Sequence, residues 1–174
     1  MGNLCPIITK KREIATSLHC GYSQRQLKRY NRPMSEFRFF HPIEVRYGDL
    51  DPQGHLNNAK YLTYFEAGRI HYFTHLGIFT PGQSFQDVNV ILAEARVTFL
   101  AAVEYGTPVK VGVRTSKMGN KSMTVDQNIV HAETGEVFAT GQVILVAYDY
   151  YTRKSVPISA EMREKISEYE GLEV

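Results

Sequence analysis

Polar and apolar residues follow a strand-like pattern at positions 43–47 and a helical pattern soon afterwards. Over 43–47 apolar and charged side chains alternate, which is the period of a half-buried strand. Residues 48–58 are rich in turn formers. From 59 to 76 apolar residues recur every three or four positions, which predicts an amphipathic helix. Asn57 or Asn58 can cap the start of this helix.

Strand-like patterns dominate the rest of the chain. The Gly119-Asn120 pair and the segment 133–136 are turn signals between neighbouring apolar runs, which predicts consecutive hairpins. A short helix is expected to begin at Ser159, with Met162 and Ile166 on its apolar side. The predicted strands cover residues 91–99, 109–113, 123–129 and 137–148.

The order of these elements predicts an α+β fold. Consecutive hairpins form an antiparallel sheet, and one long helix is available to cover it. The simplest arrangement is a curved five-stranded sheet that wraps around the helix and buries one face against it. Such a sheet leaves open edges, which favours pairing with further copies of the chain in a homodimer or homotetramer.

The composition is that of a folded domain of ordinary size. The 174 residues are 43% hydrophobic and 22% charged, which excludes wholesale disorder. No apolar run is long enough to form an integral membrane segment. Cys5 and Cys20 are the two cysteines, so a disulfide framework or a four-cysteine metal site is excluded. This cysteine usage favours a reducing, cytoplasmic location.

Charge divides the chain into a basic leader, residues 1–35, and a domain, residues 36–174. The leader has seven basic residues and one acidic residue, whereas the domain has thirteen basic and seventeen acidic residues. The mildly acidic domain has no field suited to nucleic acid. The leader has three interpretations: a mobile extension, an organelle-targeting segment, and a lipid-anchored start at Met1-Gly2 in which Pro6 departs from the usual pattern.

Residues 46–61 carry the most informative stretch, Arg-Tyr-Gly-Asp-Leu-Asp-Pro-Gln-Gly-His-Leu-Asn-Asn-Ala-Lys-Tyr. This string resembles the hotdog-fold acyl-CoA thioesterases of the 4-hydroxybenzoyl-CoA thioesterase type. The likeness continues through residues 61–69 and 135–139, and it covers about residues 37–166 in order and spacing. The resemblance implies a hotdog fold and a homo-oligomer that builds its sites at the interface between chains.

The resemblance also implies which residues carry the chemistry. Asp51 falls on the catalytic carboxylate, and Asn58 falls on the residue whose backbone N–H polarises the thioester carbonyl. The implied reaction is hydrolysis of an acyl-CoA, or an acyl-carrier-protein thioester, to a free acid and a thiol, with no metal or other cofactor. The remaining candidates for contact with the substrate are Gly54, His55, Asn57 and Tyr61.

The residues support the same site without the resemblance. Thioester hydrolysis needs a base or nucleophile, and a donor for the negative charge that forms on the carbonyl oxygen. Asp51 lies in a turn just before the predicted helix, whose first N–H groups are free to donate. Asp51 would attack the carbonyl itself or activate a water that does, and both routes stay open.

Other titratable residues compete for these roles. Asp49 is two residues from Asp51, and the resemblance selects Asp51. In another thioesterase branch of this fold the catalytic carboxylate is a glutamate on the long helix, a role that Glu66 would take here. His71 and His75 stand four apart, a spacing that permits metal ligation. No third ligand is evident beside them, so we expect two helix-surface histidines.

Two other functions stay as alternatives. Hotdog hydratases and dehydratases carry an Asp-x-Asn-Pro-x-His string, whereas Asp51 and His55 here are four apart with no Asn-Pro between them. A non-catalytic acyl-CoA-binding protein of the same fold is the second alternative, although no helix-turn-helix accompanies it. For the coenzyme A phosphates, Arg114, Lys117 and Lys121 around one hairpin are candidates, and solvated edge-strand charges are the other interpretation.

Overall fold

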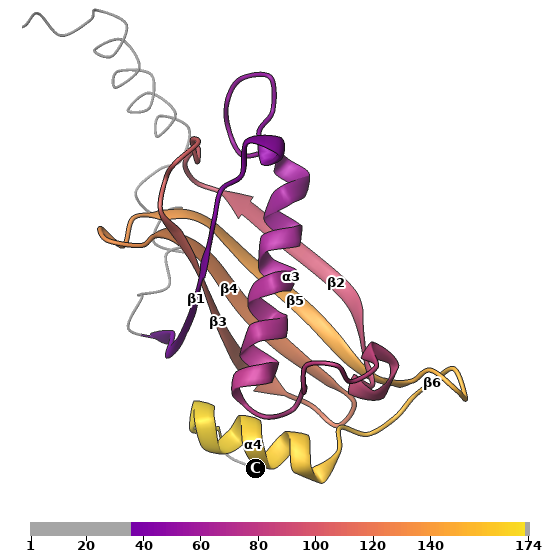
Figure 1. The fold of residues 1–174 in the computed structure, drawn as a ribbon. Coiled ribbons are helices and arrows are strands. Elements are labelled where there is room, and N and C mark those ends of the chain that lie inside the picture. Colours follow the sequence, from indigo (N-terminus) through magenta and orange to yellow (C-terminus); the bar gives the residue numbers. More distant parts are fainter. Residues whose placement is uncertain (1–35, 173–174) are drawn as a thin grey trace, which may run out of the picture.

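The computed structural model describes residues 36–172. These residues form an antiparallel sheet that curves around a central helix (Figure 1). The strand order is β1-β3-β4-β5-β2, with the short β6 paired to the end of β5. This confirms the predicted α+β arrangement, while the predicted leader, residues 1–35, lies outside the described residues. The elements are β1 (Phe39–Ile43), the 3-10 turn η3 (Tyr47–Asp49), α3 (Asn58–His75), the 3-10 turn η4 (Phe85–Val88), β2 (Val90–Phe99), β3 (Val109–Met118), β4 (Ser122–His131), β5 (Val137–Asp149), β6 (Lys154–Ser155) and α4 (Ala160–Glu170).

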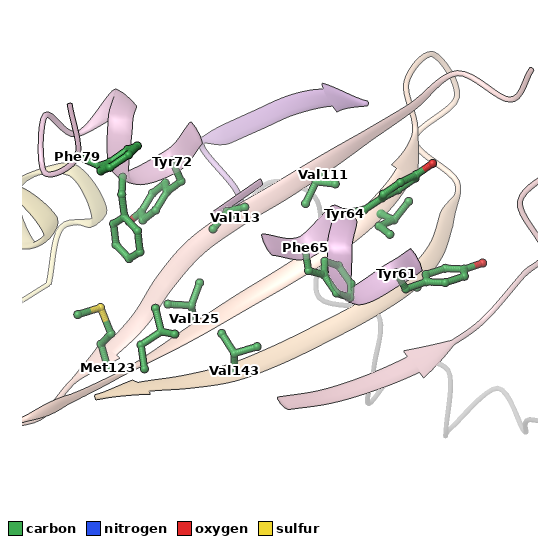
Figure 2. Packing of buried hydrophobic residues seen from close by; sticks show 14 of the residues in the cluster. Tyr61, Tyr64, Phe65, Tyr72, Phe79, Val111, Val113, Met123, Val125 and Val143 are labelled. Carbon is green, nitrogen blue, oxygen red and sulfur yellow. The ribbon is translucent and has the colours of Figure 1, made fainter. Parts of the chain in front are cut away.

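The core forms between the inner face of the sheet and helix α3 (Figure 2). The alternation predicted for β3 is confirmed, because Val111 and Val113 are fully buried and lie on the helix side. Two glycines allow the helix to approach closely. A Cβ on Gly68 would lie 2.6 Å from Val111 Cγ1, and a Cβ on Gly141 would lie 2.7 Å from the ring of Phe65. The sheet therefore positions the whole length of α3.

The helix boundaries follow the capping signals in the sequence. Asn57 is the N-cap of α3, and its Oδ1 accepts a hydrogen bond from the N–H of Ala59 at 3.0 Å. Ser159 caps α4 in the same way, accepting from the N–H of Met162 at 3.2 Å. Helix α4 closes the end of the sheet where α3 ends (Figure 1). The start of α3 lies at the opposite end, beside the loop that precedes it.

The first strand lies four residues earlier than predicted. Strand β1 pairs with β3 and ends at Ile43, and residues 47–49 form a 3-10 turn instead of strand. Within the predicted strand Val45 is buried, but Tyr47 is 81% exposed. The Asp49 carboxylate accepts a hydrogen bond from the N–H of Arg46. Such a local bond competes with strand pairing and turns the chain toward α3.

Strand β2 forms one open edge of the sheet. It pairs with β5 alone, and a bulge between Leu92 and Glu94 interrupts its alternation. Ile91, Leu92 and Phe99 are 39–47% exposed along this edge. A single chain therefore presents an apolar edge strand to solvent, which is the arrangement expected of a surface that pairs with a second copy.

Candidate functional site

A short hairpin leads into α3 and carries the predicted catalytic carboxylate. Its two arms pair at Leu50 and Leu56. At its tip the N–H of Asp51 donates to the carbonyl of His55 at 2.7 Å, and the N–H of Gly54 donates to the carbonyl of Asp51 at 2.9 Å. Gly54 has φ +80°, a conformation that favours glycine. The turn is therefore held by its own backbone immediately before the helix.

The two oxygens of the Asp51 carboxylate have different surroundings. Oδ1 accepts hydrogen bonds from the N–H of Gln53 at 2.9 Å and from the N–H of His55 at 3.1 Å, as in an Asx turn. Oδ2 accepts no hydrogen bond from any residue in the described part of the chain, and the side chain is half-buried. One oxygen thus holds the turn, while the other is available to a substrate or a water.

The start of α3 presents a free backbone donor. The N–H of Asn57 donates to the carbonyl of Asp49 at 2.9 Å, and the Asn57 side chain accepts from Ala59. The next amide, the N–H of Asn58, has no acceptor among residues 36–172. The first amides of a helix lack intrahelical partners and lie at the positive end of the helix dipole. This amide is suited to receive a negatively charged oxygen.

Tyr61 lies one turn into α3 and is almost fully buried. Its ring packs edge-to-face on Phe99 of β2, with ring centroids 4.8 Å apart. Burial, together with the charge of Asp51, raises the pKa of Tyr61 to about 12. The Tyr61 hydroxyl is therefore protonated at neutral pH and lies close enough to Asp51 to sense its charge.

The competing carboxylate, Asp49, is fully engaged by its neighbours. Lys60 Nζ lies 3.0 Å from Oδ1, Arg46 Nε lies 3.2 Å from Oδ2, and the Tyr64 hydroxyl donates to Oδ2 at 2.9 Å. Burial would raise the pKa of Asp49, but the hydrogen bonds from Lys60, Tyr64 and Arg46 lower it to about 2. Asp49 is thus a buried anchor for the segment that leads to Asp51.

A cavity of about 320 Å³ lies farther along α3, between the helix and β2. Its walls are mostly apolar, and Glu66 and Arg69 are its charged residues.

The spacing of Glu66 and Arg69 in the helix predicts an ion pair between them, but Arg69 Nη1 instead donates to Gln127 Oε1 at 2.9 Å. Burial lowers the pKa of the Arg69 guanidinium. The sequence pattern could have indicated this partner. The alternation of β4 puts Gln127 at an inward-facing position between buried neighbours, so its amide lies in the core.

Three cavities of the described residues do not include the predicted catalytic pair. Neither the cavity beside Arg69 nor two others of about 320 and 440 Å³ is lined by Asp51 or Asn58. None of these three cavities therefore offers space for an acyl group directly beside the predicted reactive groups.

The histidines on α3 have aromatic partners on neighbouring elements. His71 stacks on His41 of β1, with ring centroids 3.6 Å apart, and His75 lies 5.3 Å from Phe39 and 5.4 Å from Tyr169. Within residues 36–172, no three His, Cys, Asp or Glu side chains gather in a way that could hold a metal ion.

The basic hairpin lies at the other end of the molecule from Asp51. Lys121 Nζ donates to the carbonyl of Ser155 at 3.0 Å, and Arg114 pairs with Glu36 at 3.0 Å. This hairpin joins β3 to β4 near the end of α3, and the 18 residues of that helix span about 27 Å (Figure 1). Within one chain, these cations are remote from Asp51.

Comparison with known proteins finds one consistent family. A family model described as the Thioesterase-like superfamily matches residues 45–166. The chain is 30% identical over 132 residues to the uncharacterized protein YsmA of Bacillus subtilis (strain 168), covering 76% of this chain and 87% of YsmA. It is 23% identical over 126 residues to the long-chain acyl-CoA thioesterase FadM of Escherichia coli (strain K12), covering 72% and 95% of the two chains.

The fold is shared with solved thioesterase structures. A thioesterase from Thermus thermophilus, complexed with coenzyme A and Zn, superposes with a TM-score of 0.71 and 32% sequence identity. The superposition covers 81% of this chain and all of the Thermus chain. The family match, residues 45–166, contains the hairpin that holds Asp51, helix α3 and the strands β2 to β5.

Proposed function

Since this chain belongs to the Thioesterase-like superfamily and is a thioester hydrolase, we propose that its substrate is an acyl-CoA and that Asp51 and Asn58 carry the reaction. The substrate class is supported by the relatives, because the Thermus structure is described as a complex with coenzyme A. The products are a free carboxylic acid and the thiol of coenzyme A.

The proposed chemistry uses the free oxygen and the free amide described above. Asp51 Oδ2 either attacks the thioester carbonyl carbon or removes a proton from a water that attacks it. The carbonyl oxygen becomes negatively charged and accepts a hydrogen bond from the N–H of Asn58. The C–S bond then breaks and sulfur leaves as the thiolate. In the direct route this leaves an anhydride between the acyl group and Asp51, which water hydrolyses to the free acid and the Asp51 carboxylate. In the other route the attacking water supplies the oxygen of the acid, and the proton held by Asp51 passes to the thiolate. One preorganised donor of this kind contributes about 2.7–4 kcal/mol to an acyl-transfer transition state.

The observation that carries this proposal is the presence of two complementary unpaired groups in one short segment. Asp51 has an oxygen without a hydrogen-bond partner, and Asn58 has an amide without an acceptor, within the described chain. Asp49, the other carboxylate in the segment, has both oxygens engaged. Asp51 is therefore the carboxylate that can act on a substrate without breaking the local structure. Gly54, His55, Asn57 and Tyr61 shape the surroundings of the thioester.

We further propose that a second copy encloses the acyl group. Strand β2 leaves apolar side chains exposed at its edge, and Asp51 lines none of the three cavities described above. Antiparallel pairing of two β2 edges about a two-fold axis reverses the second chain end for end. The end of the partner at which its β2 begins would then lie beside the Asp51 end of the first chain. A homodimer, or a tetramer built from it, would complete the site.

Among residues 36–172, the helices lack the combination of length and hydrophobicity that spanning a bilayer requires. The cysteine usage favours a cytoplasmic location, which stays a prediction beside the organelle-targeting interpretation of the leader.

The experiment is a hydrolysis assay over short, long, branched and aromatic acyl-CoA esters, with Asp51→Asn as the test variant. Asparagine keeps the Oδ1 acceptor that holds the turn and removes the base, so we expect the turnover to fall by at least about 100-fold while the fold persists. Asp149→Asn is the matched control. Asp149 Oδ1 accepts from the N–H of Tyr151 at 2.8 Å and of Thr152 at 3.1 Å, a similar Asx turn at the opposite end of the same chain.

The control variant should hydrolyse the esters at the wild-type rate. Undiminished turnover in Asp51→Asn would move the chemistry to another group, and Glu66→Gln then becomes the variant to test. Absence of hydrolysis by the wild-type chain across the whole series would contradict the acyl-CoA proposal itself.

A further inference from the structure

Two exposed tyrosines lie beside the hairpin that carries Asp51. Tyr47 begins η3, three residues before the hairpin, and is 81% exposed. Tyr105 is 64% exposed and follows Glu104, whose backbone pairs with His55 of the hairpin. The two rings contact each other edge-to-face, with centroids 6.3 Å apart and planes at 87°. Segments that are far apart in the sequence therefore meet here through aromatic side chains.

Packing within the described chain does not explain why these two tyrosines are exposed side by side. Within residues 36–172, neither ring has another aromatic partner and neither hydroxyl forms a hydrogen bond. An edge-to-face contact leaves a ring face open to solvent. Exposed aromatic faces at the rim of a site are the surfaces on which planar bases stack.

A guanidinium with free donors stands next to the pair. Arg46 precedes Tyr47, and its side chain is 68% exposed. Its Nε pairs with Asp49 at 3.2 Å, but its two terminal nitrogens have no acceptor in the described chain. Asp49 is also neutralised by Lys60. Because Lys60 shares the Asp49 carboxylate, Asp49 does not depend on Arg46 alone, and the planar guanidinium is suited to a phosphate group.

We propose that Tyr47, Tyr105 and Arg46 bind the nucleotide end of coenzyme A, with adenine stacked on a tyrosine face and a phosphate on the guanidinium. This inference rests on the proposed function and specifies its substrate. Coenzyme A and acyl carrier proteins present the thioester on the same phosphopantetheine arm, but only coenzyme A carries adenine. A base-stacking surface within reach of Asp51 therefore identifies free acyl-CoA, and not a carrier-bound acyl group, as the donor.

The test compares one acyl group on coenzyme A and on pantetheine, which lacks the nucleotide. In the double variant Tyr47→Ala/Tyr105→Ala we expect the KM for acyl-CoA to rise by about tenfold, the equivalent of about 1.4 kcal/mol. The kcat should stay within about twofold, because the catalytic groups are untouched. The KM for acyl-pantetheine should not change. Phenylalanine at both positions keeps the ring faces and should restore the wild-type KM.

Competition by the free nucleotide separates stacking from general effects. Adenosine 3′,5′-bisphosphate should inhibit acyl-CoA hydrolysis competitively in the wild type. This inhibition should weaken by about tenfold in the double variant and, through loss of the phosphate contact, in Arg46→Gln.

Three results would overturn the inference. Equal KM values for acyl-CoA and acyl-pantetheine in the wild type would show that the nucleotide contributes nothing. An equal rise in both KM values in the double variant would show that the tyrosines act on the hairpin or the arm. A selective loss of activity toward an acyl carrier protein would assign the surface to that partner. If the wild type hydrolyses no thioester, calorimetric titration of coenzyme A into the wild type and the double variant still measures the stacking. The proposed reaction and the proposed nucleotide site can therefore fail separately.

Discussion

Replacing Gly68 by alanine measures how closely α3 lies on the sheet. An alanine Cβ would lie 2.6 Å from Val111 Cγ1 and 3.2 Å from Val113 Cγ2. Carbon atoms in contact prefer separations of about 3.5–4.0 Å. Both valines are fully buried in the middle of the sheet, so they cannot relieve the overlap by moving toward solvent. The helix or the strand must shift instead.

Two opposing effects set the size of the change. Overpacking a core of this kind costs about 1–3 kcal/mol. Alanine in place of glycine in a helix interior returns about 0.8–1.0 kcal/mol. Because the shortest contact is well below any normal separation, we expect Gly68→Ala to lower the free energy of unfolding by about 1–2 kcal/mol. For a chain of this size, that lowers the Tm by about 2–8 °C.

Thermal or urea unfolding, followed by circular dichroism at matched protein concentration, measures the change, since oligomerisation makes the Tm depend on concentration. The variant Val111→Ala removes the opposing methyl groups and is the partner in a double-mutant cycle. The double variant should be more stable than the sum of the two single effects by about 1 kcal/mol. A Gly68→Ala protein that is more stable than the wild type, with no coupling to Val111, would refute the close packing of α3 on β3.

Three further predictions concern the buried aspartate, the cap of α3 and the leader. The pKa of Asp49 is about 2, below its ordinary 3.8. The stability that the ionised carboxylate gives the folded protein is therefore complete above about pH 4 and is lost as the pH falls through 2. Unfolding measurements in acid should show a shrinking difference in the free energy of unfolding between the wild type and Asp49→Asn. Asn57→Ala removes the cap of α3 and should lower stability by about 1 kcal/mol together with turnover. Asn57→Asp should preserve the stability, because a carboxylate also caps the helix, but should lower turnover, because its charge repels the oxygen anion at the Asn58 amide; melting and hydrolysis assays measure both. Deletion of residues 1–35 should leave turnover largely unchanged, and an unfolded product would show that the leader belongs to the core.

The local patterns in the sequence predicted most of the elements, because their causes are local. Asn57 and Ser159 cap their helices with their own side chains, and the apolar alternation in β3 reflects the sheet face that packs on α3. The one displaced element, β1, was misplaced for the same kind of reason. An aspartate three residues from Arg46 turns the chain at a point where alternation alone favours a strand.

Predicting the candidate site residues required two sources of information, the sequence and the folded structure. The turn formers before α3 and the resemblance of residues 46–61 pointed to Asp51 and Asn58 from the sequence. The sequence offered no physical reason to prefer Asp51 over Asp49. That reason lies in contacts with Lys60 and Tyr64 on the first turns of the helix, which occupy Asp49 and leave Asp51 with a free oxygen.

Sequence patterns alone were sufficient for the fold class, the caps of both helices and the position of the turn that holds Asp51, because periodicity and turn chemistry act over a few residues. Three features came from the folded chain: which carboxylate is free, that β2 is an exposed apolar edge, and that Tyr47 meets Tyr105 beside the hairpin. These features depend on side chains 11 to 58 residues apart, such as Asp49 with Lys60 and Tyr47 with Tyr105. No local pattern encodes them, because such residues become neighbours only after the sheet has curved around its helix.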